Sequence, residues 1–212
     1  MAFAETTRAG VEDELREAIL TGRLVDWRTG YVTADDPANG AGWDAQRTVP
    51  GALLAELFSV AEGPRRPWAL RLAGARVVGQ LDLEAAEVVC PLLLRACWFA
   101  EPVVLSEARA PALWLPGCHL PGLSAERLTT RGDLRLSDGL TVGGSVRLGR
   151  AHIGDQLDLS GATLTNPDGP HSTPTGSPST RTCSAGRDSP RPGRSAWPAP
   201  TSAGTSSSTG RP

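Results

Sequence analysis

The sequence predicts a mainly β protein: a β-solenoid with an N-terminal α-helical cap and a disordered C-terminal tail. Two observations carry this prediction. A Leu-x-Leu triplet, or a close variant of it, recurs between Leu70 and Leu159 at steps of 10 to 12 residues. Small residues also recur at fixed places between the triplets. A short unit repeated at a near-constant step is typical of stacked repeats, in which each unit buries its apolar side against its neighbours.

Each triplet is predicted to be a short strand, because the first and third residues of a strand point to the same side. One unit is too short to enclose a core, whereas two units, about 22 residues, complete a turn. Leucines of every second unit should then form an interior ladder: Leu72, Leu94, Leu115 and Leu136. Two columns of mostly small residues should stack in the same way: Ala75, Cys97, Cys118, Leu140 and Ala162, and Ala86, Ala108, Leu128 and Ala151.

Turn residues separate the triplets, where the backbone is expected to need unusual dihedral angles. They are Gly79, Pro91, Pro102, Pro111, Pro121, Gly132, Gly143 and Gly154.

Residues 1–66 are predicted to form the helical cap, which would cover the unpaired strand edges at one end of the solenoid. Residues 1–9 are expected to be disordered, 11–22 and 49–61 to be helices, and 30–42 to be a loop, from the apolar spacing and the Gly and Pro positions. Trp27 and Trp43 should anchor the helices to the solenoid, which is assigned to residues 67–166.

Residues 167–212 are predicted to be a disordered tail, because they consist mainly of Ser, Thr, Pro, Gly and Arg. The genetic code supports a further hypothesis, that this tail is frameshifted. Back-translated with GC-rich codons and read one base out of frame, residues 195–210 can encode IRLAGAHIGGHLELDG, which matches nine of the sixteen residues at 146–161. The codons were chosen to favour the match. The hypothesis places the slip near Gly169 and makes a truncated, non-functional product one alternative for the chain.

The stretch LRLAGARVVGQLDL at residues 70–83 resembles the repeat unit of an actinobacterial group of pentapeptide-repeat-like β-helix proteins. The resemblance covers residues 43–164 and implies a right-handed quadrilateral β-helix. Members of this group often carry the label membrane-associated oxidoreductase, so the resemblance implies that activity as an alternative. The repeat itself indicates fold and not chemistry.

Composition narrows the function classes. The net charge is −2, all 21 basic residues are Arg, and residues 61–164 carry eleven acidic and eleven basic groups. This balance argues against a nucleic-acid-binding protein, which should carry a basic stripe, and against a protein that mimics DNA, which should be an acidic rod. There is no signal-peptide pattern and no apolar run long enough for a transmembrane segment, so a cytoplasmic location is expected. Cys97 and Cys118 are expected to be small buried residues, with a disulfide or a thiol site as the alternative.

No catalytic, cofactor-binding or metal-binding motif is found. His119 and His152 lie about one and a half turns apart and should face opposite sides of the solenoid. Paired carboxylates at Asp82 and Glu84, and at Asp155 and Asp158, are more typical of a solvated outer face than of general acid–base chemistry. The chain is therefore expected not to be an enzyme.

A non-catalytic scaffold or protein-interaction module remains the predicted function, with an unidentified protein partner. Its possible interaction patch comprises Leu93, Trp98, Phe99 and Trp114, of which Leu93 and Trp114 should be neighbours on an outward-facing column. The alternative is that the N-terminal helices cover these side chains. Peripheral membrane contact and oligomeric state stay open.

Overall fold

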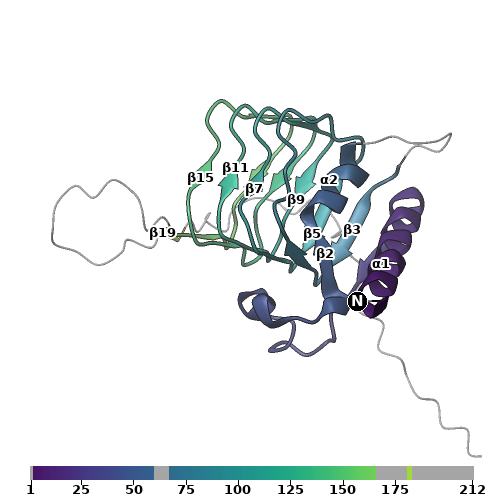
Figure 1. The fold of residues 1–212 in the computed structure, drawn as a ribbon. Coiled ribbons are helices and arrows are strands. Elements are labelled where there is room, and N and C mark those ends of the chain that lie inside the picture. The colour runs from purple at the N-terminus through teal and green to yellow at the C-terminus, as the bar shows by residue number, and fades with distance from the viewer. Residues whose placement is uncertain (1, 60–66, 166–180, 183–212) are drawn as a thin grey trace, which may run out of the picture.

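The computed structural model describes residues 2–59, 67–165 and 181–182. Residues 67–165 wind into a β-solenoid of about four and a half turns, in which the short strands of successive turns lie side by side and parallel (Figure 1). A full turn contributes a segment to each of four sheets, named here A to D in chain order. The predicted mainly β solenoid is confirmed, and it has four sides.

The strands assort into these sheets by turn. Sheet A contains β1 (Leu24–Asp26), β3 (Leu70–Ala73), β5 (Leu92–Arg95), β9 (Leu113–Trp114), β13 (Leu134–Arg135) and β17 (Leu157–Asp158). Sheet B contains β2 (Thr48–Pro50), β4 (Arg76–Val78), β6 (Trp98–Phe99), β10 (His119–Leu120), β14 (Thr141–Val142), β18 (Thr163–Leu164) and the antiparallel β19 (Arg181–Thr182). Sheet C contains β7 (Val103–Val104), β11 (Leu123–Ser124) and β15 (Val146–Arg147). Sheet D contains β8 (Arg109–Ala110), β12 (Thr129–Thr130) and β16 (His152–Ile153).

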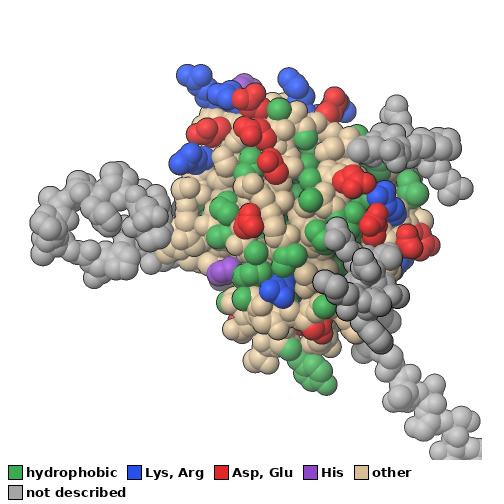
Figure 2. All heavy atoms as spheres, viewed as in Figure 1, with side chains coloured by type: hydrophobic (Ala, Val, Ile, Leu, Met, Phe, Trp, Pro, Cys, Tyr) green, Lys and Arg blue, Asp and Glu red, His purple; other side chains and the backbone are tan. Residues whose placement is uncertain are grey.

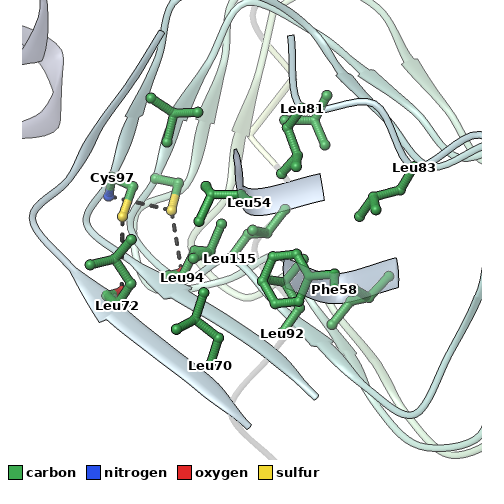
Figure 3. Close-up of a cluster of buried hydrophobic side chains, with 14 of the residues drawn as sticks. Leu54, Phe58, Leu70, Leu72, Leu81, Leu83, Leu92, Leu94, Cys97 and Leu115 are labelled. Atoms are coloured by element: carbon green, nitrogen blue, oxygen red, sulfur yellow. Dashed lines mark hydrogen bonds between the residues drawn. The ribbon is translucent and has the colours of Figure 1, made fainter. Parts of the chain in front are cut away.

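The leucine ladder along the interior is confirmed. Leu72 pairs with Leu94 across β3 and β5, and Leu115 and Leu136 continue the column in the next two turns. All four side chains are at most 1% exposed. Figure 3 shows Leu72, Leu94 and Leu115 pointing into the interior of the solenoid. Because every turn buries its inner face against the turns beside it, the stability of each turn depends on its neighbours.

Both columns of mostly small residues also form as predicted. In sheet B the amides of Trp98, His119, Thr141 and Thr163 each donate to the carbonyl one turn earlier, at Ala75, Cys97, Cys118 and Leu140. In sheet D the amides of Arg109, Thr129 and His152 donate to Ala86, Ala108 and Leu128. Like positions therefore lie one strand spacing apart, about 4.8 Å.

Positive φ angles recur once in every repeat unit, at a position different from that of the predicted turn residues. The residue four positions after the start of each triplet has φ between +48° and +71°, namely Gly74, Ala85, Ala96, Glu107, Gly117, Arg127, Asp138, Arg150 and Gly161. Of the predicted turn glycines only Gly79 has a positive φ. Gly154 is required instead by close approach, because an added Cβ would lie 2.2 Å from the Arg131 carbonyl oxygen.

The cap contains strands as well as helices. β1 pairs in parallel with β3, and β2 pairs in parallel with β4, so residues 24–50 extend two sides of the solenoid. Helix α2 (Gly51–Ser59) follows β2 and points Leu54 and Phe58 into the open end of the core (Figure 3). Helix α1 (Ala2–Thr21) packs on α2, β1 and β3. Together these elements complete the apolar interior at this end.

The helix boundaries differ from those predicted. Helix α1 begins at Ala2, within a segment expected to be disordered, and ends one residue before Gly22, whose φ is +69°. Helix α2 begins two residues later than expected, because Thr48–Pro50 pairs with β4. The predicted loop 30–42 holds the 3-10 helix η1 (Pro37–Gly42), and η2 (Ala45–Arg47) follows it. The predicted helix end at 60–61 and nearly all of the tail lie outside the described residues.

A buried arginine fixes this loop to the first corner of the solenoid. The Arg47 side chain donates to the Gly74 carbonyl at 2.9 Å and to Asp35 at 3.0 Å, and stacks 3.8 Å from the Trp43 ring. Burial alone would raise the pKa of Asp35, but backbone hydrogen bonds from Thr29 and Gly30 and the charge of Arg47 lower it overall. Trp43 thus anchors the loop rather than a helix.

Trp27 does contact a helix. Its indole nitrogen lies 3.4 Å from a carboxylate oxygen of Glu14 on α1, and its ring packs against the core.

Candidate functional site

The three described thiols are packing residues. Cys97 and Cys118 stack in one column, and the Cys97 amide donates to the Cys118 sulfur at 3.5 Å (Figure 3). Burial raises the pKa of Cys118 well above its usual value and raises the pKa of Cys90 to about 11. A protonated, buried thiol is a poor nucleophile and a poor metal ligand. The structure therefore favours the packing role over a thiol site.

The polar groups considered for chemistry are spread over the solenoid. His119 lies on sheet B and His152 on sheet D, which confirms that they face opposite sides. Asp82 accepts a hydrogen bond from the Glu84 amide and Asp158 accepts one from the Ser160 amide, both at 2.9 Å. These two carboxylates thus bind the backbone of the corner that follows them. Among the described residues no group of three or more His, Cys, Asp and Glu could hold a metal ion.

The structure brings together two of the four residues of the predicted interaction patch and separates the other two from them. Phe99 points into the core and is 2% exposed, whereas its neighbour Trp98 faces outward on sheet B. Trp98 lies against η1, where a Cβ on Gly40 would come 2.2 Å from the Trp98 Cβ. Leu93 and Trp114 are neighbours on the outer face of sheet A, as predicted.

Leu93 and Trp114 offer little open apolar surface. Leu93 is only 6% exposed, and the partly buried Trp114 ring lies 4.4 Å from the Arg135 guanidinium. Arg135 is itself held by a hydrogen bond of 2.7 Å to Asp133. Helix α1 packs across the end of the solenoid, on β1 and β3.

A groove of about 570 Å³ lies on the outside of sheet D. Its floor is the strand backbone at Val88 and Ala110. Two rows of residues border it, Glu87, Arg109 and Thr129 on one side and Val89, Pro111 and Arg131 on the other, and Pro67 lies at its edge. The rows follow from the register, because Glu87 pairs with Arg109 and Arg109 with Thr129.

Two exposed arginines, Arg109 and Arg131, line this groove. Neither Arg109 nor Arg131 forms an ion pair with another described residue, whereas the neighbouring Arg127 pairs with Glu107. Figure 2 shows that acidic and basic side chains are interspersed on the visible face of the protein. Sequence reasoning missed this groove, although the two-unit turn would have aligned positions 87, 109 and 129.

No helix among the described residues is long and apolar enough to cross a membrane. Comparison of the chain with family models, curated proteins and solved structures found no match.

Proposed function

We propose that the chain is a non-catalytic scaffold whose sheet D groove docks an acidic segment of a partner protein. The observation that carries the proposal is the pair of exposed arginines, Arg109 and Arg131, which border one groove and form no ion pair with another described residue. They outnumber Glu87, the acidic side chain among the residues that line the groove. A planar guanidinium binds a carboxylate through two parallel hydrogen bonds, so two of them in adjacent turns suit an extended chain with spaced carboxylates.

The rest of the groove is consistent with this use. Its volume falls within the range of about 300 to 1,000 Å³ typical of ligand sites. Thr129 adds a hydroxyl to the same row as Arg109, and Pro111 gives the facing row a stiff apolar wall. The floor is strand backbone whose amides and carbonyls are already paired between turns. The surface is therefore rigid, which reduces the entropy lost on binding.

The test uses a short fluorescein-labelled peptide rich in Asp and Glu, with binding followed by fluorescence anisotropy at low and physiological salt. Arg109→Glu should weaken binding by at least about fivefold, because it removes a charged hydrogen bond and adds a like charge. Arg147→Glu, on sheet C, is the matched control and should leave binding within about twofold. Equal losses from both variants, or no loss from either, would contradict the groove as the docking site.

A separate measurement tests the oxidoreductase alternative that the family resemblance implies. An absorption spectrum of the purified full-length protein with a flavin, haem or metal signature would favour it over a purely docking role.

A further inference from the structure

The two ends of the solenoid differ in how well their interiors are covered. Along one sheet A column, Leu70, Leu92, Leu113 and Leu134 are at most 1% exposed, whereas Leu157 in the last turn is 43% exposed. The inner side chains around it are only partly buried as well: Val146, Leu148, Ile153, Leu159 and Leu164. At the first turn the equivalent surface is covered by α2 and β1.

The partners of the last strands also change. From β2 to β18 every strand pair in sheet B is parallel, but β18 meets β19 in antiparallel orientation. An antiparallel partner cannot continue the winding of a solenoid in which each turn repeats the direction of the one before. β15, β16 and β17 are edge strands among the described residues. This end therefore has the shape of a surface on which another turn would stack.

We propose that residues 146–165 form the seat of further solenoid turns, and that the same gene encodes those turns in a shifted reading frame downstream of about Gly169. The shifted frame joins the third base of each codon to the first two bases of the next. Read this way, residues 195–210 can give the repeat IRLAGAHIGGHLELDG. That string has the triplet, the small residues and the glycine turn of residues 146–161.

One part of this match does not depend on codon choice. Trp197 has a single codon, TGG, so the shifted codon that ends in its first two bases can encode only Leu, Val or Met. The next shifted codon joins its final G to the CC of Pro198 and encodes Ala. An apolar residue followed by a small one is what the end of the triplet requires.

The experiment first reads the gene and then restores the frame. We expect the DNA to be open in the shifted frame from codon 170 to codon 210, and we expect one base inserted after codon 169 to yield a chain with continued repeats. In this frame-restored chain, amide hydrogen exchange of residues 146–165 should slow by at least about tenfold relative to the original chain. Exchange of residues 24–50, at the covered end, should be unchanged.

A substitution distinguishes stacking from general stabilisation. Leu157→Asp should lower the Tm of the original chain by no more than about 2 °C, but lower that of the frame-restored chain by roughly 5 °C or more, because the added turn would bury the charge. Leu20→Asp, at a site 37% exposed on α1, should act equally in both chains. A stop codon in the shifted frame, unchanged exchange at 146–165, or equal effects of Leu157→Asp would overturn the proposal. Concentration-dependent protection of 146–165 in the original chain would assign this end to a second copy and would overturn it too.

Discussion

Shortening one leucine in the middle of the solenoid should cost far more stability than the same change in its last turn. Leu113 and Leu157 occupy the same sheet A column, and the register pairs each of them with Leu134. Leu113 is fully buried between two other leucines, whereas 43% of Leu157 is exposed. The same substitution at the two positions therefore removes the same atoms, and only the burial of the leucine side chain differs.

The expected magnitudes follow from burial and from the cavity left behind. Leu113→Ala removes a buried side chain between fixed neighbours and should lower the free energy of unfolding by about 3 to 4 kcal/mol. Leu157→Ala loses roughly half as much buried area and opens toward solvent instead of leaving a closed cavity. Its cost should be about 1 kcal/mol.

Equilibrium urea unfolding, followed by circular dichroism and tryptophan fluorescence, measures both variants. Stacked repeats need not unfold in one step, so the two signals should be compared before a single free energy is assigned. If the variants lost the same stability within about 0.5 kcal/mol, the last turn would be packed as tightly as the middle. That result would refute the description of an uncovered end.

Four further predictions concern individual residues. Burial raises the pKa of Cys90 from 9.0 to about 11. The stability that this shift contributes is complete below pH 9 and is lost as pH rises toward 11. Urea unfolding across this pH range should therefore show the free energy of unfolding fall by up to about 2 kcal/mol. Gly74→Ala, at φ +71°, should destabilise the chain by roughly 1 to 3 kcal/mol, whereas Ala96→Gly, at φ +48°, should be neutral or stabilise it by up to about 1 kcal/mol, as thermal unfolding would show. Arg47→Met leaves Asp35 buried without its cation and should cost about 3 kcal/mol in urea unfolding. In the parent chain the lowered pKa of Asp35 contributes stability that is present above its ordinary pKa of 3.8 and is lost on acidification below it, which an acid titration measures.

The repeat could be predicted because its information is local. A triplet fixes which side chains point inward, and the step between triplets fixes which residues stack, so the ladder of Leu72 and Leu94 follows from counting. The strands of the cap follow no such rule. Leu24–Asp26 and Thr48–Pro50 lie off the period and are separated by a long loop, and only the sheets beside them select their conformation.

Surface features were harder to predict than the core. The alternation that points Trp98 outward points Phe99 inward, so only one of these neighbours could join a surface patch. Whether an outward residue is open depends on what folds over it, as η1 does at Trp98. The groove with Arg109 and Arg131 could be found only by considering two neighbouring rows together, each of which crosses three turns. The positive φ at Glu107 and Arg127 had no glycine to signal it.

The helices cover the N-terminal end of the solenoid, so further turns could be added only at the opposite end. Duplication of a segment of about 22 residues at the far end would add one turn, about 4.8 Å along the axis of the solenoid, and would leave the existing turns unchanged. The reach of the solenoid is set by how many copies of the segment are read, and its cross-section stays constant.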